Sequence, residues 1–200
     1  MGIPFKAVFL DRDGVINELV YHQEQEVIDS PFTENQFRLV KNIPAAIKVL
    51  HTANYQIIVI SNQPGVAKRQ MSLSTFEKIT QKMHRQLAAK NAHLDGEYYC
   101  FHHADAKLKK YRLDCDCRKP KPGMLLQAAQ ELNLDLKQSW FIGDNLSDVQ
   151  AGRAAGCRTI LLSKIKCNLC QQMVNRNTAP DFITPEVLQA TDIILHNRDI

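Results

Sequence analysis

Short apolar runs alternate along the chain with stretches in which apolar residues recur every three or four positions. The runs are compact and rich in β-branched or aromatic residues, which is typical of buried strands; they lie at 6–10, 56–60, 96–101, 140–142 and 159–162. The stretches with helical spacing lie at 43–53, 74–87, 123–132 and 146–155. This alternation predicts an α/β fold in three layers, with a doubly wound parallel sheet covered by helices on both faces.

Local signals mark where two of these helices begin. Pro44 stands in the first turn of the helix predicted at 43–53. The segment Ser74-Thr-Phe-Glu77 is a capping box, which predicts the start of the next helix. The last forty residues are less periodic, and there we expect a short helix at 185–190 and an edge strand at 192–195. We expect one domain over residues 1–200, with a core at about 6–162 and a C-terminal extension at 163–200.

The composition is that of a globular domain. Apolar residues make up 44% of the 200 residues and charged residues 23%, which excludes a disordered, collagen-like or fibrous body. No apolar run approaches the roughly 20 residues of a membrane-spanning helix. The acidic Asp11 comes too early for a signal peptide. These features predict a cytoplasmic protein that acts without a membrane, and we expect a monomer.

A mild excess of positive charge is concentrated in one region. The 25 lysines and arginines outnumber the 21 acidic residues by four. A cluster of basic side chains can bind nucleic acid or a small anionic substrate, or it can form a solvated face of the protein. The basic side chains that crowd this region are Lys107, Lys109, Lys110, Arg112, Arg118, Lys119 and Lys121.

Polar residues directly follow three of the predicted strands. In open parallel sheets, ligands bind beyond the carboxyl ends of the strands, so we expect these segments to converge on one edge. The segment Arg118-Lys119 lies between the second and the last of them, ahead of a helix. The polar residues in these segments are Asp11 and Asp13, Ser61 and Asn62, and Asp144 and Asp148.

This set of side chains suits phosphoryl transfer, which needs a nucleophile, a metal, positive and neutral donors, and an acid for the leaving group. A carboxylate can be the nucleophile through an aspartyl-phosphate, and Asp144 offers a ligand for a hard cation such as Mg²⁺. The neutral donors are Ser61 and Asn62, and Arg118 or Lys119 supplies positive charge. Each of these short motifs is common by itself. Their occurrence in this order, each after an apolar strand, indicates an active site.

The cysteines suggest a second metal. The segment 100–117, which we call the cysteine loop, contains Cys100-x-His102 and Cys115-x-Cys117. Three thiols and one imidazole are a complete tetrahedral set for structural Zn²⁺, although buried free thiols and a hydrogen-bonded histidine are the alternatives. Zn²⁺ here would brace a loop that leads directly into Arg118-Lys119.

The residues at the strand ends resemble the motifs of the haloacid dehalogenase-like superfamily. Residues 8–16 look like its first motif, and Ser61, Lys119 and 143–148 match its second, third and fourth motifs. The resemblance covers roughly residues 6–162 and implies a Mg²⁺-dependent phosphatase. It implies that Asp11 is the nucleophile and that Asp13 is the general acid and base.

The same resemblance implies how Mg²⁺ is held: by Asp11, by the backbone carbonyl of Asp13 and by Asp144, with Asp148 supporting these ligands. Many members of the superfamily carry a cap domain after the first or the second motif. About thirty residues separate Asp13 from the helix at 43–53, and fewer than sixty lie between the second and third motifs. We therefore expect a capless member, with a rim built from residues 17–26, residues 63–69 and the zinc-braced cysteine loop.

Around the cysteines the sequence resembles one smaller family within this superfamily. Residues 98–103 and 115–124 are similar to those of the zinc-containing D-glycero-D-manno-heptose-1,7-bisphosphate 7-phosphatases, whose near relatives are the histidinol-phosphatases. The similarity implies zinc ligands at Cys100, His102, Cys115 and Cys117. It implies phosphate contacts at Ser61, Arg118 and Lys119, beside the neutral donor Asn62.

The chain departs from that family at two places. A Gly-Tyr pair is usual shortly after Asn17, whereas this chain has a longer segment with Tyr21 as its aromatic residue. Pro64 stands where a small serine is common. Cys167-x-x-Cys170 lies outside the resemblance, and free structural thiols, a metal half-site and a redox pair are its possible roles.

The favoured prediction is a phosphatase that cleaves the 7-phosphate of a heptose 1,7-bisphosphate, in the synthesis of lipopolysaccharide or nucleotide-heptose precursors. A histidinol-phosphate phosphatase is the first alternative. A zinc-braced nucleic-acid module would leave Asp11, Asp13 and Asp144 unexplained, since carboxylates repel phosphates unless a metal lies between them. A nucleic-acid end phosphatase would reconcile both features, and a phospho-acceptor signalling domain would need neither Asp13 nor the cysteine loop.

Overall fold

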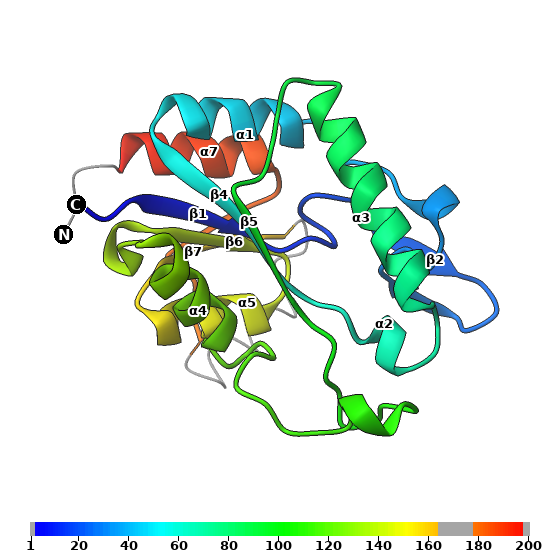
Figure 1. Cartoon of the computed structure of the whole chain (residues 1–200). Coiled ribbons are helices and arrows are strands. Elements are labelled where there is room, and N and C mark those ends of the chain that lie inside the picture. The colour runs from blue at the N-terminus through cyan, green and yellow to red at the C-terminus, as the bar shows by residue number, and fades with distance from the viewer. Residues whose placement is uncertain (1–2, 164–177, 198–200) are drawn as a thin grey trace.

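The computed structural model describes residues 3–163 and 178–197 and shows a parallel sheet between two layers of helices (Figure 1). Within these residues the sheet has six strands, in the order β5-β4-β1-β6-β7-β8. They are β1 (Lys6–Leu10), β4 (Tyr55–Asn62), β5 (Gly96–Cys100), β6 (Trp140–Gly143), β7 (Arg158–Leu162) and β8 (Phe182–Thr184). The three-layer, doubly wound α/β prediction is confirmed.

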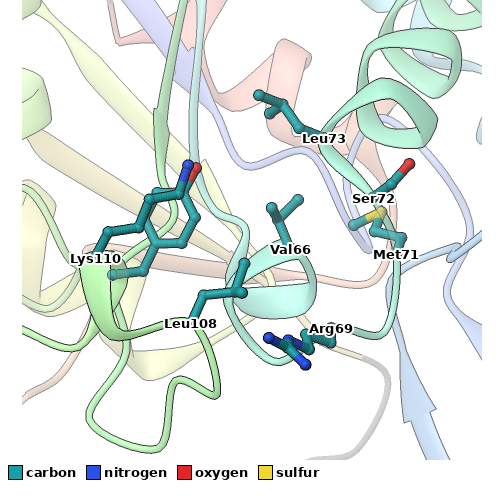
Figure 2. A pocket seen from close by; sticks show the side chains of 8 residues that line it. Val66, Arg69, Met71, Ser72, Leu73, Leu108 and Lys110 are labelled. Carbon is teal, nitrogen blue, oxygen red and sulfur yellow. The ribbon is translucent and has the colours of Figure 1, made fainter.

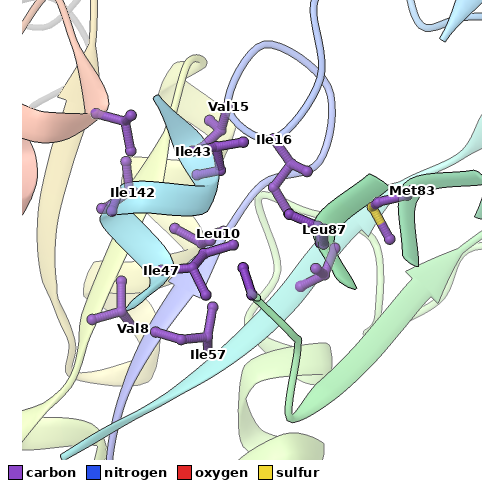
Figure 3. Close-up of a cluster of buried hydrophobic side chains, with 14 of the residues drawn as sticks. Val8, Leu10, Val15, Ile16, Ile43, Ile47, Ile57, Met83, Leu87 and Ile142 are labelled. Carbon is purple, nitrogen blue, oxygen red and sulfur yellow. The ribbon is translucent and has the colours of Figure 1, made fainter. Parts of the chain in front are cut away.

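The central strand β1 is buried on both faces, which explains its unbroken apolar run. It pairs in parallel with β4 on one side and β6 on the other. Val8 and Leu10 pack into one hydrophobic cluster, and Ala7 and Phe9 pack into the other. Figure 3 shows the first cluster, where Val8 and Leu10 lie beside Ile47 and Ile57.

Helices cover both faces of the sheet. On one face α1 (Ile43–Thr52) packs beside α7 (Val187–His196), and on the other α4 (Gly123–Leu132) packs beside α5 (Leu146–Ala155) (Figure 1). The long helix α3 (Leu73–Ala88) buries its apolar residues in the same cluster as α1. The prediction at 43–53 ends one residue too late, whereas those at 123–132 and 146–155 match the observed helices.

Two local predictions are wrong. Residues 192–195, expected to form an edge strand, belong to α7, because Ala190, Thr191 and Ile194 recur at helical spacing and are buried. The edge strand is β8 instead. The capping box at Ser74–Glu77 does not begin α3, because Ser72 is the N-cap and its hydroxyl accepts a hydrogen bond from the Thr75 amide.

The connections at the carboxyl edge of the sheet form a rim. They are a hairpin of β2 (Val20–His22) and β3 (Val27–Asp29), the 3₁₀ turn η1 (Glu34–Gln36), the short helix α2 (Pro64–Ala67), and the cysteine loop with its 3₁₀ turn η2 (Lys109–Tyr111). A further 3₁₀ turn, η3 (Leu136–Gln138), precedes β6. Within the described residues these insertions form no separate cap domain, as expected. Among the same residues, no helix is both long enough and apolar enough to cross a membrane.

The order of the strands places a crevice beside β1. The chain runs from β1 through β4 to β5 on one side, then returns to build β6, β7 and β8 on the other. Ligands of doubly wound sheets bind where this direction reverses, which here is between the carboxyl ends of β1 and β6. Asp11 follows β1 and Asp144 follows β6, so the topology itself brings them together.

Candidate active site

The backbone around Gly14 approaches Asp144 very closely. Gly14 has a φ of +83°, a conformation that side-chain-bearing residues rarely adopt. A Cβ atom at this position would lie 2.0 Å from Oδ2 of Asp144. Glycine is therefore required both for the turn after Asp13 and for the approach of this turn to Asp144.

A buried ion network joins three of the predicted site residues. The ammonium group of Lys119 lies 2.9 Å from Oδ1 of Asp11 and 2.6 Å from Oδ1 of Asp148, and it donates a 2.9 Å hydrogen bond to the carbonyl of Ile60. Lys119 and Asp148 are almost wholly buried. Since an uncompensated buried charge is costly, each of these groups depends on the others.

The acidity of the carboxyl groups reflects crowding and burial. Burial raises the pKa of Asp11 to about 6, aided by Asp148 and Asp13 and opposed by Lys119. Burial and the charges of Asp11 and Asp148 raise the pKa of Asp144 to about 8. Burial works against the charge of Lys119, but Asp11 and Asp148 outweigh it and raise the pKa of this ammonium. The site holds more negative charge than its lysine balances.

This excess of negative charge suits a divalent cation. One carboxylate oxygen from each of Asp11, Asp144 and Asp148 lies within 4.8 Å of the others. Oxygen ligands of this kind are those that Mg²⁺ prefers. Asp148 already binds Lys119, and its Oδ2 accepts a 3.0 Å hydrogen bond from the Asn145 amide at the start of α5. Both oxygens of Asp148 are thus engaged, whereas Asp11 contacts Lys119 through Oδ1 alone, so Asp144 and Oδ2 of Asp11 are the carboxylate groups best placed to bind a metal.

The carboxylate of Asp13 is surrounded by donors. Its Oδ1 accepts a 2.9 Å hydrogen bond from Asn17 Nδ2 and forms an ion pair with Arg12 at 3.2 Å. Its Oδ2 accepts a 2.6 Å hydrogen bond from Gln63 Nε2. Arg12, Asn17 and Gln63 are fully buried, and the Nη1 atom of Arg12 has no protein partner.

Sequence reasoning missed these three supporting residues. Gln63 stands beside the recognised pair Ser61-Asn62, and Arg12 lies between the two aspartates, so their positions alone were a weak signal. Glutamine and asparagine are common in loops, and only the fold shows that they point at one carboxylate. Gln63 Oε1 also accepts a 2.8 Å hydrogen bond from Arg12, which closes the network.

Ser61 and Asn62 end β4 but have different partners. The hydroxyl of Ser61 accepts a 3.1 Å hydrogen bond from Gln63, and it favours the ionised form of Asp11, which lowers the pKa of that carboxyl. The Asn62 side chain accepts from the Lys119 amide and donates to the Lys119 carbonyl, at 3.1 Å each. Asn62 therefore holds the backbone that presents Lys119, and its second amide hydrogen is what it can offer a phosphate.

The four predicted zinc ligands lie together at the carboxyl end of β5. Cys117 Sγ is 3.1 Å from the Sγ atoms of both Cys100 and Cys115, and 3.3 Å from Nδ1 of His102. These separations are too long for disulfide bonds. Zinc with Zn–S bonds of about 2.3 Å would place tetrahedral sulfur ligands about 3.8 Å apart. The cluster therefore fits a zinc ion after small side-chain adjustments.

The cysteine loop contacts the phosphate side of the site through Arg118. Its guanidinium donates a 3.0 Å hydrogen bond to the carbonyl of His102, one of the clustered residues. The next residue is Lys119, whose backbone Asn62 holds. Whatever orders the cysteine loop therefore also positions Arg118 and Lys119.

Comparisons with known proteins place this geometry in a family. Residues 116–190 match the model of the HAD-hydrolase-like family. The D-glycero-beta-D-manno-heptose-1,7-bisphosphate 7-phosphatase of Pasteurella multocida is 41% identical over 159 residues, which cover 80% of this chain and 82% of the relative. The protein of the same name from Escherichia coli K12 is 36% identical over 191 residues, covering 96% and 88%. The chain belongs to this phosphatase family.

A solved structure agrees with this assignment. The D,D-heptose 1,7-bisphosphate phosphatase of B. bronchiseptica, complexed with magnesium and phosphate, superposes with a TM-score of 0.75 at 27% identity. The match covers 96% of this chain and 98% of that one. The protein is thus a phosphoric monoester hydrolase with a HAD-like fold, and the resemblance seen in the sequence is confirmed.

The rim of the phosphatase contains a basic cleft of about 540 Å³ between the β2–β3 hairpin, the end of α2 and the cysteine loop. Lys68, Arg69 and Lys107 line it, with Asp105 as the acidic residue. Lys68 is five positions after Gln63, mostly through α2, which is about 8 Å at a helical rise of 1.5 Å per residue. The helix α2 thus links the lining of the cleft to Gln63, the residue that bonds the carboxylate of Asp13.

A second cavity, of about 480 Å³, lies on the other side of Arg69 and is mainly apolar. Figure 2 shows Val66 and Leu108 between the side chains of Lys110 and Arg69. The ammonium of Lys110 lies 4.7 Å from the centre of the Tyr111 ring. The lysines of the cysteine loop are therefore divided, with Lys107 at the basic cleft and Lys110 at the apolar cavity.

Proposed function

We propose that this phosphatase hydrolyses D-glycero-β-D-manno-heptose 1,7-bisphosphate at the 7-phosphate. One observation carries the proposal: the buried ion network of Asp11, Lys119 and Asp148 lies at the switch point of the sheet, beside the carboxylate of Asp144. The named relatives supply the identity of the sugar. The site supports the type of reaction, because the Asp11 carboxylate, the Lys119 ammonium and a position for a metal ion beside Asp144 can all contact one phosphate group.

In this proposal Asp11 attacks the phosphorus and becomes an aspartyl-phosphate. The attacking group must be ionised, and Lys119 opposes the burial that would otherwise keep Asp11 protonated. Lys119 also provides positive charge where the phosphate oxygens lie. Ser61, the free amide hydrogen of Asn62, and Arg118 are the further donors to the phosphate in this proposal.

Asp13 is the general acid and base. It delivers a proton to the sugar oxygen that leaves, and then takes a proton from the water that hydrolyses the aspartyl-phosphate. Arg12, Asn17 and Gln63 hold its carboxylate in one position through direct hydrogen bonds. These three residues touch Asp13 and act through it, so we infer that they are positioning residues.

Mg²⁺ fits beside Asp11 and Asp144, with Asp148 in support. The fit rests on the excess of carboxylate over ammonium in the crevice and on the raised pKa of Asp144. When bound, Mg²⁺ neutralises charge on the phosphate oxygens. The backbone carbonyl of Asp13 remains the third protein ligand in this proposal.

The Cys100, His102, Cys115 and Cys117 set is proposed to bind structural Zn²⁺. The four side chains fill a tetrahedral coordination sphere, so no position remains for a catalytic water. The hydrogen bond from Arg118 to the His102 carbonyl transmits the order of this site to the phosphate pocket.

The second phosphate of the substrate is proposed to bind in the basic cleft. Lys68, Arg69 and Lys107 line this cleft and outnumber its acidic lining residue, Asp105. Binding energy gained at the non-reacting phosphate can raise the rate at the reacting one. Lys110 is assigned no part in this contact. That the enzyme works as a monomer in the cytosol stays a prediction.

The test is phosphate release from a panel of substrates: both anomers of heptose 1,7-bisphosphate, histidinol phosphate, and DNA with a 3′-phosphate end. The β-anomer is expected to have the highest kcat/KM. The Asp11→Asn variant, prepared in parallel, controls for contaminating phosphatases. A higher kcat/KM with histidinol phosphate or with DNA ends would replace the proposed substrate by that one.

A further inference from the structure

A cluster of two histidines and one aspartate lies at the edge of the sheet opposite the active site. His51 is in the last turn of α1, and His93 and Asp95 precede β5. His51 Nε2 lies 2.8 Å from Oδ2 of Asp95, and His93 Nε2 lies 3.5 Å from Oδ1 of the same carboxylate. We propose that these three side chains bind a divalent transition-metal ion, at a site independent of the phosphatase reaction.

The separations of the three groups suit a shared metal. One possible ligand atom from each lies within 4.8 Å of the others. Bonds of about 2.0–2.2 Å to nitrogen and oxygen place the ligands of a tetrahedral zinc about 3.3–3.6 Å apart, and those of an octahedral ion about 3.0 Å apart. The observed 2.8 and 3.5 Å, which join the two histidines to different oxygens of Asp95, are of the same order. To bind one ion, the stacked rings of His51 and His93 would turn so that both Nε2 atoms point to the same position beside the Asp95 carboxylate.

The two imidazole rings are already arranged side by side. The rings of His51 and His93 stack with centroids 4.2 Å apart and an angle of 15° between their planes. Both rings present Nε2 to the Asp95 carboxylate, His51 to Oδ2 and His93 to Oδ1.

The carboxylate is held by the backbone. The amide of Ile57 donates a 2.7 Å hydrogen bond to Oδ2 of Asp95, and the amide of Asp95 donates a 2.8 Å hydrogen bond to the Ile57 carbonyl. Hydrogen bonds of this kind orient the ligands of metal sites. His93 is 70% exposed, so solvent molecules can complete the coordination sphere. Imidazole with carboxylate favours Zn²⁺, Co²⁺, Ni²⁺ or Cu²⁺ over Mg²⁺.

The position of the cluster separates it from catalysis. Ile57 and Ser61 are four residues apart on β4, which is about 13 Å along a strand. Asp95 directly precedes β5 and Cys100 ends it, so this strand would carry a metal site at each of its ends. A metal on the histidine cluster would join the end of α1 to the start of β5. Because only the folded chain assembles the three ligands, metal binding would stabilise the folded state.

The experiment is a Co²⁺ titration of the protein with its cysteine site loaded with zinc and with Mg²⁺ in excess. We compare the unchanged chain with His93→Gln, and with His196→Gln as the matched control on an exposed histidine elsewhere. The unchanged chain and the control should bind one more Co²⁺ per chain than His93→Gln. The visible spectrum of this additional Co²⁺ should show the absorption bands of Co²⁺ bound to nitrogen and oxygen, without the charge-transfer absorption of Co²⁺ bound to thiolate. Any Co²⁺ that enters the carboxylate site near Asp11 does so equally in all three proteins, so it cancels when their Co²⁺ contents are compared.

Thermal unfolding provides an independent readout. Co²⁺ should raise the melting temperature of the unchanged chain and of His196→Gln more than that of His93→Gln. Phosphatase activity should be the same in all three proteins, because none of these side chains approaches the active site. Equal Co²⁺ uptake by the unchanged chain and His93→Gln would overturn the proposal, as would an extra Co²⁺ with thiolate absorption.

Discussion

Gln63 donates a 2.6 Å hydrogen bond from Nε2 to Oδ2 of Asp13, although fifty residues separate the two in the chain. The same side chain accepts a hydrogen bond from Arg12 and donates one to Ser61. Gln63 therefore connects the end of β4 to the turn after β1. Through its hydrogen bonds with Asp13, Arg12 and Ser61, it holds the carboxylate of the proposed general acid in place.

Replacing Gln63 by leucine should lower kcat more than it changes KM. The substitution removes three hydrogen bonds and leaves the buried Arg12 with fewer partners, which costs about 1–3 kcal/mol of stability. With Asp13 less well held, we expect kcat to fall about 10- to 100-fold, at the lower end of what acid–base catalysis contributes. Steady-state kinetics and a melting curve measure both effects. Gln127→Leu on the exposed face of α4 is the control, and an unchanged kcat in Gln63→Leu would contradict the positioning role.

Asp11→Asn should abolish turnover without unfolding the protein. The amide cannot form the aspartyl-phosphate, so we expect kcat to fall by a factor on the order of 10⁴ or more. Asp13→Asn should slow both steps, by about 10²- to 10⁴-fold. Phosphate release and circular dichroism check these expectations together. Near-normal turnover by a clean Asp11→Asn preparation would remove Asp11 from the role of nucleophile.

The stability of the metal-free protein should depend on pH through Asp144. The pKa of this carboxyl is raised from 3.8 to about 8 in the folded state. A raised pKa means that its contribution to stability is present in full below pH 3.8 and is lost as the pH rises to about 8. Relative to Asp144→Asn, the unchanged chain should therefore lose stability across this range in chelator, measured by urea unfolding.

Mg²⁺ should reverse this loss. Binding requires the ionised carboxyl groups of Asp11 and Asp144, so the apparent Kd for Mg²⁺ should fall as the pH rises from about 6 to about 8. Calorimetry in buffers of different ionisation enthalpy should detect the protons released. A Kd that is independent of pH over this range would show that these carboxyl groups are not the ligands.

Cys115→Ser should lower the zinc content from about one ion per chain and destabilise the cysteine loop. We expect a fall in melting temperature of roughly 6–12 °C, equivalent to about 3 kcal/mol for a chain of this size. Activity should fall indirectly, because Arg118 bonds the carbonyl of His102. Elemental analysis and melting curves are the measurements. A zinc-free variant that keeps full stability and activity would exclude a structural role for zinc.

Lys68→Ala with Lys107→Ala should impair the bisphosphate selectively. Loss of the charge-assisted hydrogen bonds from these lysines to the non-reacting phosphate should lower kcat/KM for the bisphosphate about 10- to 100-fold. The rate with the corresponding 7-monophosphate should change little. Lys110→Ala, which alters the apolar cavity, is the matched control. If the double variant affects both substrates equally, the basic cleft does not bind the second phosphate.

The local pattern of the chain by itself determined five of the six described strands of the sheet, most of its helices and the ends of the strands that carry chemistry. Strand and helix periods are properties of neighbouring residues, so β1, α4 and α5 could be predicted from short segments. Asp11, Asp13 and Asp144 could be found because the carboxyl ends of parallel strands meet. The cysteine cluster was visible for a similar reason, since two closely spaced pairs of ligands flank one loop.

Only the tertiary structure decided which partners surround these residues. The contacts of Gln63 with Asp13 and of Asn62 with Lys119 span fifty and fifty-seven residues, and no local pattern encodes them. The apolar residues at 193–195 suit a strand as well as a helix, and packing of α7 against α1 selected the helix. The opposite placement of Lys107 and Lys110 followed from the fold of the cysteine loop. Cys167 and Cys170 lie outside the described residues. Side chains far apart in sequence compete for one buried space, and that competition is resolved only when the whole domain packs.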